Sequence, residues 1–447
     1  MNIQTFFGLI FSFFYIFNVF GKNCPIVEPY ANTCTECVAT VGKNDTHASF
    51  ITAKKNPYAG KRIFIAWSKG GGAHESMYRA LDCYLKEQCS VTAFNPIQDV
   101  LHSLDPVRTF TFQRYNGEDV YNYLLVRNMP RVINTFVSWG IGSMRRQHPM
   151  MVRLLREYFK SQKPELVISV VPVLNSALAE ACELEKIPFL LIAPDLNITS
   201  YFIKDTKKSW QHVYCTLPFN DDLGWHSIRQ AGVNPHLFVA AGFPLKESFF
   251  APKDLKSIRK DFNVPDNKPV VMMLMGGAGS LKLISYIKYI ARLPLPLHLI
   301  ICMGRGKSVR LQAKIKALRL PSHITFSAIG FTDRIADLMA VSDVLISKTG
   351  PTSLCEAIQM RLPLILDCTS CLLDWEKLHP EFVKKHDLGI VLTSFKHLEK
   401  ALHKTIFDKE YRKRVKSNME RYSNDKFYEM LDELLAHIFR QHTPCTC

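Results

Sequence analysis

The segment 329–367 restricts the fold of this chain more than any other part of the sequence. Short apolar runs of the kind found in buried strands occupy residues 324–329, 344–347 and 362–366, and residues 335–339 carry apolar side chains at helical spacing. Strands and helices therefore alternate along this part of the chain. The alternation predicts an α/β fold with a parallel sheet and right-handed crossovers.

A polar, glycine-containing loop at residues 348–353 follows the second of these strands and would open a helix. The N-terminus of a helix offers free backbone N–H groups and a positive dipole end, which suit a phosphate. Glu356, one turn into the helix, can accept hydrogen bonds from the vicinal hydroxyls of a ribose. The alternative is a Ser/Thr N-cap with a glutamate near the third helical position, which is a capping box without a ligand.

The length of 447 residues allows two domains, and 47% hydrophobic with 21% charged residues is typical of a globular protein with a core. A formal net charge of +16 fits nucleic acid, an anionic membrane surface or an anionic small molecule. No zinc-finger or RNA-recognition spacing occurs, so nucleic acid is the least favoured partner. The 13 cysteines are scattered and odd in number, which indicates reduced thiols. Cys34 and Cys37 are spaced for zinc but lack a second pair nearby.

The first 20 residues form an apolar stretch without a charged side chain, of borderline length for a bilayer span. The stretch fits either a signal peptide or an uncleaved anchor. A basic region before it and a small-x-small cleavage site are missing, which favours the anchor. Basic residues follow the stretch, so the positive-inside rule favours a body on the cytoplasmic side of a membrane. Residues 23–58 are polar, contain Pro and Gly, and are typical of a linker.

A further strand, glycine loop and helix stand near the start of the globular part. The buried-type strand RIFIAW runs into Gly71, Gly72 and Ala73, and an amphipathic helix follows at 75–87. His74 would then stand at the N-terminus of this helix. Glycine alone is a weak signal, because any tight strand-to-helix turn uses it. A lone histidine is more often structural than catalytic.

The same order of elements recurs in the second half of the chain. Strand 269–275 and helix 281–292 flank a loop that contains Gly276, Gly277, Gly279 and Ser280. Such a loop exposes backbone N–H groups to a diphosphate. A Walker ending is absent and the dinucleotide fingerprint is incomplete, which argues against a P-loop NTPase and an NAD enzyme. Arg305, after strand 297–303, fits a phosphate contact or a solvated loop cation.

Four more strands are expected between the two glycine loops, at 166–171, 189–193, 211–215 and 237–241. A helix is predicted to begin at His148–Pro149, with proline in its first turn and with one apolar and one basic face. Such a helix suits either a core-facing surface helix or contact with anionic lipid headgroups. Asp195 stands at the carboxyl end of a strand, where a helix cap or turn residue is the alternative to a functional role.

Taken together, these motifs resemble GT-B glycosyltransferases. The closest branch is the glycolipid-forming one, with monogalactosyldiacylglycerol synthases and bacterial diacylglycerol glucosyltransferases, and the lipid-II-forming N-acetylglucosaminyltransferase is a more distant relative. The matching pieces are 330–332, 338–339, 343–346, 348–351, 356–357 and 362–363, and the resemblance extends more thinly over residues 61–392. It implies two Rossmann-like domains facing a cleft.

The resemblance also implies site residues. Those for a UDP-sugar are Gly276, Gly277, Gly279, Ser280, Arg305, Phe331, Lys348, Thr349, Gly350, Pro351, Thr352, Ser353, Glu356 and Glu376. In this set the glycine loop 276–280 and loop 349–353 hold the diphosphate, Glu356 the ribose, Phe331 the base and Glu376 the sugar. Trp375 replaces a glutamine of the family, and His379 stands where the family has an asparagine.

On the acceptor side, the glycolipid synthases carry three glycines followed by histidine, and here Ala73 replaces the last glycine after Gly71 and Gly72. The resemblance implies that His74 is the general base for the acceptor hydroxyl or orients it, and that Asp195 matches a catalytic aspartate. The methyl group of Ala73, which glycine lacks, is expected to tighten the loop.

The expected domains are 1–22 as membrane anchor or signal segment, 23–58 as linker, 59–245 as acceptor-binding domain, 246–424 as nucleotide-sugar-binding domain, and 425–447 as a C-terminal helix packing back on the first domain. The expected reaction moves a hexose from a UDP-sugar to a membrane lipid, foremost 1,2-diacylglycerol, with inversion, without cofactor or metal, at an anionic membrane surface. Alternatives are a polyprenyl-linked saccharide acceptor, a nucleotide-sugar epimerase, and a non-catalytic UDP-sugar-binding membrane subunit.

Overall fold

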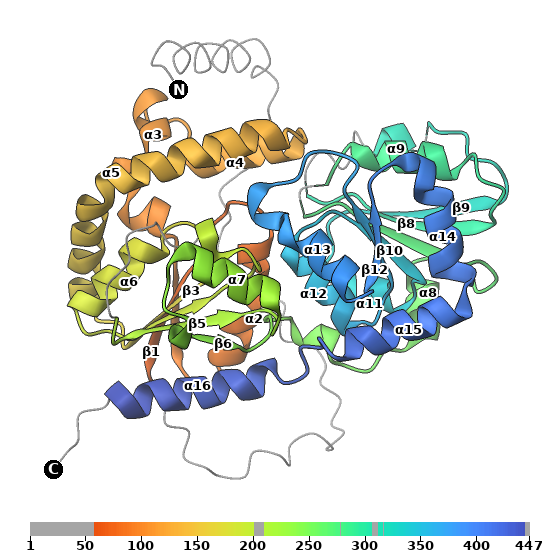
Figure 1. The fold of residues 1–447 in the computed structure, drawn as a ribbon. Helices are drawn as coiled ribbons and strands as arrows, with labels where there is room; N and C mark the ends of the chain where they lie inside the picture. The colour runs from red at the N-terminus through yellow and green to blue at the C-terminus, as the bar shows by residue number, and fades with distance from the viewer. Residues whose placement is uncertain (1–57, 201–209, 278, 306–311, 316, 443–447) are drawn as a thin grey trace. The chain divides into compact units, whose positions relative to one another are not determined.

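A computed structural model describes residues 58–442, apart from 201–209, 278, 306–311 and 316. The apolar segment 1–22 and nearly all of the expected linker lie outside the described residues. Within them, the chain builds two sheets of six strands each, and every strand pair is parallel. The predicted α/β class with parallel sheets is confirmed (Figure 1).

The first sheet belongs to what we call the N-terminal lobe and has the order β2-β1-β3-β4-β5-β6. Its strands are β1 (Arg62–Ala66), β2 (Ser90–Phe94), β3 (Leu166–Ser169), β4 (Phe189–Ile192), β5 (Val213–Leu217) and β6 (Phe238–Ala240). Its helices are α2 (Ala73–Leu85), α3 (Pro106–Phe110), α4 (Gly117–Val126), α5 (Pro130–Gln162), α6 (Asn175–Leu184) and α7 (Asp222–Ala231).

The second sheet belongs to the C-terminal lobe and has the order β12-β11-β10-β7-β8-β9. Its strands are β7 (Val270–Leu274), β8 (Leu297–Cys302), β9 (Ile324–Ile329), β10 (Val344–Ser347), β11 (Leu364–Asp367) and β12 (Gly389–Leu392). Its helices are α8 (Leu255–Asp261), α9 (Lys282–Ile290), α11 (Ile335–Ala340), α12 (Pro351–Gln359), α13 (Leu378–Lys385), α14 (Leu398–Phe407) and α15 (Lys409–Glu420). The last described helix is α16 (Phe427–His442).

The strands are apolar on both sides because helices cover both faces of each sheet. Along β1, Ile63 and Ile65 pack with Met77 of α2, whereas Phe64 packs with Leu155 of α5 in a different cluster. Side chains that alternate between two cores account for the unbroken apolar run in this strand. The cluster around Ile63 also includes residues of β7 and β10, so apolar contacts join the two lobes.

Helix α5 corrects one prediction. The chain does not begin a helix at His148–Pro149, because a single helix runs from Pro130 to Gln162 with Pro149 in its interior. An interior proline removes one helical hydrogen bond and crowds the preceding turn, and this cost is why the sequence favours a boundary there. Tertiary contacts stabilise the helix. Met151, Leu155 and Phe159 are buried in the cluster that contains Phe64, and His148 bonds Glu180 of α6 at 2.8 Å.

The last helix, α16, lies beside the N-terminal lobe (Figure 1). Its Asp432 accepts a hydrogen bond from Tyr84 of α2 at 2.7 Å, and its Tyr428 donates one to the backbone oxygen of Leu245 at 2.7 Å. Among the helices of the described residues, none combines the length and the apolarity that a bilayer crossing needs. The cysteines in these residues are free thiols, and most of them are buried.

Candidate active site

Glycine loops of the two lobes meet. The loop after β1 and the loop after β7 come so close that a Cβ placed on Gly72 would lie 3.9 Å from the backbone nitrogen of Gly277. Gly71 and Gly276 have φ values of 86° and 82°, a conformation that side-chain-bearing residues rarely adopt. Ala73 lies one position later, as the first residue of α2, and is not among the residues with positive φ. A methyl group fits there, so the replaced family glycine does not distort this loop.

His74 enters the site from the first turn of α2. Its Nδ1 lies 2.6 Å from the backbone oxygen of Val170, just after β3, and the side chain is buried. A carbonyl oxygen can only accept, so Nδ1 carries the proton and Nε2 keeps its lone pair. Burial lowers the pKa of His74 to about 4, although the hydrogen bond to Val170 opposes the shift. The ring is therefore neutral at physiological pH, with Nε2 able to take up a proton.

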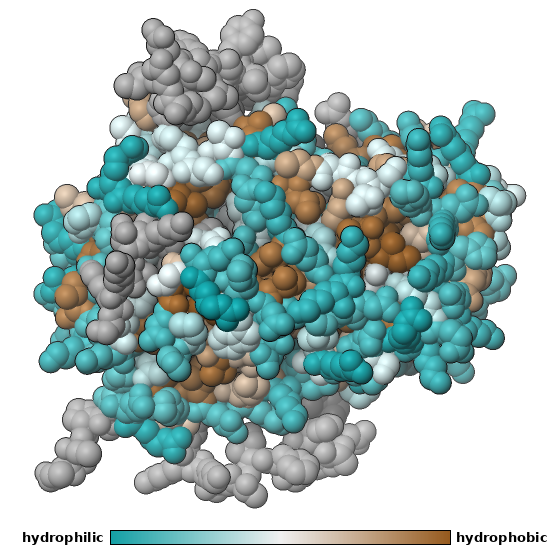
Figure 2. All heavy atoms as spheres, viewed as in Figure 1, coloured by the Kyte–Doolittle hydropathy of each residue, from teal (hydrophilic) through white to brown (hydrophobic). Residues whose placement is uncertain are grey.

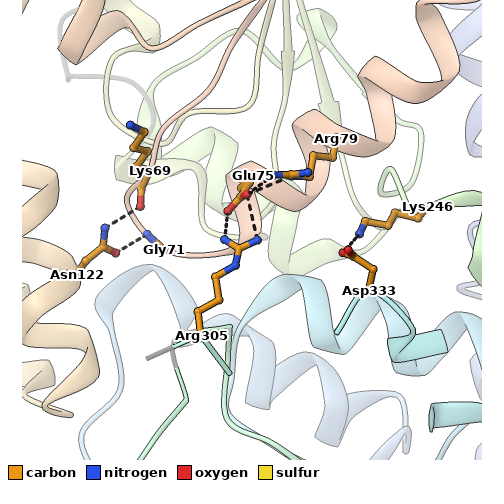
Figure 3. A network of polar contacts seen from close by, with 8 residues as sticks. All are labelled: Lys69, Gly71, Glu75, Arg79, Asn122, Lys246, Arg305 and Asp333. Carbon is orange, nitrogen blue, oxygen red and sulfur yellow. Dashed lines mark hydrogen bonds and ion pairs between the residues drawn. The ribbon is translucent and has the colours of Figure 1, made fainter. Parts of the chain in front are cut away.

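Helix α4 holds the glycine loop in place. Buried Glu118 accepts hydrogen bonds from the Ser68 hydroxyl at 2.7 Å and from the Lys69 backbone nitrogen at 2.8 Å. One turn later, the Asn122 side chain accepts from the Gly71 backbone nitrogen at 3.1 Å and donates to the Lys69 oxygen at 2.8 Å (Figure 3). Sequence reasoning missed these two residues, because neither belongs to a recognisable motif.

The predicted diphosphate loops of the C-terminal lobe lie side by side. Strands β7 and β10 pair directly, with Leu274 opposite Ser347, so the loops that follow them leave the same edge of the sheet. The Lys348 side chain lies against Gly276, where an added Cβ would come within 3.0 Å of its Nζ. Gly350 is the N-cap of α12 and no side chain caps the helix, so the capping-box alternative is wrong. The helix N-terminus keeps its backbone donors available for a ligand.

Two of the three hydroxyl groups of loop 349–353 have partners within the protein, whereas the buried Thr352 hydroxyl has none among the described residues. Ser353 bonds Ser347 Oγ at 2.8 Å, and Thr349 donates to Glu376 Oε2 at 2.5 Å. Ser280 accepts from the backbone of Lys282 at 3.2 Å. The polar groups that the loops leave for a diphosphate are thus backbone N–H groups, the Lys348 ammonium and the Thr352 hydroxyl.

Glu356 lies on the buried side of α12, in its second turn. Burial raises the pKa of Glu356 to about 8, and the positive charge of Lys246 opposes this shift. Among the residues that the structure describes, none makes a hydrogen bond to the Glu356 carboxyl group. A buried carboxyl group of this kind gains from a ligand that donates hydrogen bonds.

Glu376, His379 and Asp195 form a buried group with Thr349. His379 Nδ1 donates to the Thr349 backbone oxygen at 2.6 Å, and its Nε2 lies 3.5 Å from Oδ1 of Asp195. Asp195 follows β4 in the N-terminal lobe, whereas the other three residues belong to the C-terminal lobe. The group therefore connects a predicted catalytic residue with the predicted sugar and diphosphate residues.

Arg305 contacts neighbouring side chains, whereas the sequence suggested either a phosphate contact or a solvated loop cation. Its guanidinium reaches Glu75 of α2 with N–O distances of 2.6 and 3.2 Å (Figure 3). The guanidinium also lies 3.9 Å over the ring of Phe331. The pKa of Glu75 lies below its usual range. Burial raises this pKa, but the hydrogen bonds and positive charges of Arg305 and Arg79 lower it by more. In this structure Arg305 joins the lobes and covers the ring predicted to lie beside a base. Lys246 and Asp333 form a second contact nearby, at 3.0 Å.

Known proteins offer a family model and several relatives that are similar to this chain. Residues 270–432 match the glycosyltransferase family 28 C-terminal domain. Relatives include the monogalactosyldiacylglycerol synthase of Spinacia oleracea, 24% identical over 371 residues, and the processive diacylglycerol beta-glucosyltransferase of Bacillus subtilis (strain 168), 19% identical over 369 residues. The alignments cover 77% and 80% of this chain, and 66% and 91% of the two relatives. The chain thus spans slightly less than two thirds of the spinach protein.

Solved structures share the fold. MurG of Acinetobacter baumannii is 13% identical with a TM-score of 0.50, covering 86% of this chain and 99% of that one. HepE of Anabaena, solved in complex with UDP, is 16% identical with a TM-score of 0.52, covering 84% and 100%. Identities this low support the fold alone. Residues 270–432 match the glycosyltransferase family 28 C-terminal domain, on a chain with the GT-B fold that resembles the monogalactosyldiacylglycerol synthases and diacylglycerol glucosyltransferases.

Proposed function

We propose that this protein transfers a hexose from a UDP-sugar to the hydroxyl group of a membrane lipid, with 1,2-diacylglycerol as the acceptor. The observation that carries the proposal is His74, a neutral, buried imidazole next to the point where the glycine loops of the two lobes meet. Its Nε2 makes no hydrogen bond to any residue that the structure describes. The named relatives from spinach and Bacillus act on diacylglycerol or form its galactoside, which supports the choice of acceptor.

In the proposed reaction, His74 Nε2 takes the proton of the acceptor hydroxyl while that oxygen attacks the anomeric carbon. The bond from the anomeric carbon to the UDP oxygen breaks, and UDP leaves with the bonding electron pair. A single displacement of this kind inverts the anomeric configuration. Asp195 lies on the same lobe as His74 and would orient the acceptor.

The donor would lie along the C-terminal lobe. Backbone N–H groups of the two glycine loops, together with Lys348, would stabilise the charge on the departing diphosphate, so we propose no obligatory metal. Glu356 would accept the two ribose hydroxyl hydrogen bonds, because its carboxyl group is buried without a hydrogen-bond partner among the described residues. The remaining assignments are Phe331 beside the base, once Arg305 has moved aside, and Glu376 at the sugar.

A membrane surface is the proposed location. Three large apolar side chains are exposed near α3 and α4: Phe110 at the end of α3, Phe112 just after it, and Met129 after α4. The arginines at 127, 131, 145 and 146 are also exposed. Hydrophilic and hydrophobic side chains are mixed over the face of the molecule that Figure 2 shows. Apolar tips beside cations fit an anionic lipid surface.

The test is to incubate the purified full-length chain with labelled UDP-glucose or UDP-galactose and vesicles, and to identify the labelled lipid by mass spectrometry. Vesicles with diacylglycerol should yield a hexosyl-diacylglycerol. A product formed only with a polyprenyl-linked saccharide would assign another acceptor. UDP binding without any lipid product would assign a non-catalytic subunit, and either result would overturn the proposal.

A further inference from the structure

Two aromatic side chains from different lobes meet beside the glycine loop of the N-terminal lobe. Tyr121 comes from α4, and Trp375 from the short 3-10 helix Asp374–Glu376. Their ring centroids are 6.3 Å apart with the planes tilted by 33°, and both side chains are half-buried. The resemblance described above implies that Trp375 replaces a glutamine of the family.

Tyr121 borders the acceptor loop. A Cβ on Gly70 or Gly71 would lie 3.8 Å from the Tyr121 ring, so the ring covers these two residues. Burial, followed by the charges of Glu376 and Asp195, raises the pKa of Tyr121, which means that both carboxylates are near its hydroxyl. Its surroundings thus include the acceptor loop, a predicted catalytic residue and the predicted sugar residue.

Trp375 precedes a residue that contacts the donor loop. The next residue, Glu376, accepts the Thr349 hydroxyl hydrogen bond at 2.5 Å, and a Cβ on Gly350 would lie 3.8 Å from Glu376 Oε1. The aromatic pair therefore lies between the loop that precedes His74 and the loop proposed to hold the diphosphate. In the proposed reaction, the hexose passes from UDP to the acceptor hydroxyl between these two loops.

The segment that carries Trp375 is held by side chains of the other lobe. Asn134 of α5 donates to the Leu372 oxygen at 3.0 Å and accepts from the Asp374 nitrogen at 3.2 Å. Asn197 donates to the Asp374 oxygen at 3.2 Å. Three hydrogen bonds to backbone groups fix the loop in front of Tyr121, so the aromatic contact does not depend on the two rings alone.

We propose that Tyr121 and Trp375 form the wall against which the hexose ring of the donor lies, and that Trp375 sets the affinity for the sugar part of the UDP-sugar. This inference rests on the proposed function. A hexose presents C–H groups on one ring face, and these groups pack favourably on the electron-rich face of an indole or phenol ring. Ligand sites commonly pair such an aromatic wall with a few polar groups, here Glu376.

The test compares UDP with UDP-glucose and UDP-galactose in calorimetric titrations of the full-length chain. Trp375→Leu keeps an apolar side chain but removes the aromatic face, whereas Trp375→Phe keeps an aromatic face. We expect Trp375→Leu to weaken binding of the preferred UDP-hexose about tenfold, with UDP affinity unchanged, and Trp375→Phe to bind close to the wild-type protein. Tyr121→Leu should act in the same direction, and Tyr121→Phe should not.

Several results would overturn the inference. Unchanged UDP-hexose affinity in Trp375→Leu would do so, and so would an equal loss of UDP and UDP-hexose affinity, because the residue would then only hold the donor loop. A rise in the acceptor KM with unchanged UDP-hexose affinity would place the pair in the acceptor site instead. If the wild-type chain binds no UDP at all, the proposed function itself fails, which is a separate outcome seen before any variant is made.

Discussion

His74 and Glu356 are buried ionisable residues whose pKa values move in opposite directions. Burial disfavours the charged form of each side chain, so it lowers the pKa of His74 to about 4 and raises that of Glu356 to about 8. Both residues are therefore neutral near pH 7 before a ligand binds. A neutral imidazole can accept a proton. A neutral carboxyl group keeps one O–H donor and therefore accepts the two hydrogen bonds of a diol less well than its carboxylate does.

The His74 pKa predicts the acid limb of the reaction. With donor and acceptor saturating, kcat should stay constant between about pH 6 and pH 8 and fall only as pH drops through about 4, where Nε2 becomes protonated. An acid limb centred near pH 6.5, the ordinary histidine value, would contradict the assignment. Circular dichroism at each pH separates this effect from acid unfolding.

The Glu356 pKa predicts how donor binding depends on pH. Ribose hydroxyls favour the carboxylate, so binding must displace a proton below about pH 8, and affinity should rise with pH by up to tenfold per unit and level off above about 8. Titrations with UDP-glucose serve best, because its diphosphate does not titrate in this range. In Glu356→Gln the slope should vanish, and a slope that persists in this variant would show that another group titrates.

At the scale of elements, the loop after β7 needs glycine at one position and tolerates a side chain at another. A Cβ on Gly279 would lie 2.0 Å from the Met303 backbone oxygen, and φ is +73° there. For Gly277 no described atom lies within 4 Å of the added Cβ, and its φ is not positive. These two glycines are a matched pair for testing whether the loop geometry matters for the ligand.

Gly279→Ala should therefore displace the loop, weaken UDP binding at least tenfold and cost about 1–3 kcal/mol of unfolding free energy. Gly277→Ala should leave both quantities close to wild type. Denaturant unfolding and UDP titration of the two variants provide the measurement. Equal behaviour of the pair would mean that the turn adapts and is not a rigid cradle.

Elements with regular apolar patterns were predictable from the sequence. The expected strands 324–329 and 344–347 coincide with β9 and β10. Strand β2 was missed because it lies at a sheet edge and most of its residues are exposed, which leaves no apolar run. The start of α5 was misread because Pro149 looks like a boundary when tertiary packing is unknown.

The contacts between the two lobes could not be predicted from the sequence. Arg305 and Glu75 are 230 positions apart, and no periodicity links them. The same is true of Asp195 and His379, which come together only because β4 and α13 lie in facing lobes. Motifs could suggest which residues bind a nucleotide sugar, but not that Arg305 lies over Phe331 or that Tyr121 meets Trp375.

For the whole molecule, the distribution of charge predicts where a membrane would contact it. Arg131→Glu combined with Arg145→Glu on α5 should weaken binding to anionic vesicles at least tenfold, since each basic residue near such a surface contributes about 1 kcal/mol. Lys256→Glu combined with Lys260→Glu on exposed α8 is the control with the same change of net charge. Vesicle co-sedimentation in low and high salt gives the result. If both pairs lose binding equally, net charge and not α5 is responsible.

The most direct measurement compares His74→Ala with the wild-type chain in two parallel assays, hexose transfer from labelled UDP-hexose to diacylglycerol vesicles and equilibrium UDP binding. Wild-type protein should form the labelled glycolipid. His74→Ala should bind UDP as tightly and transfer at least 100-fold more slowly, about the contribution of one general base. Transfer by His74→Ala at the wild-type rate, or a wild-type chain that binds UDP and forms no glycolipid, would contradict the proposed chemistry.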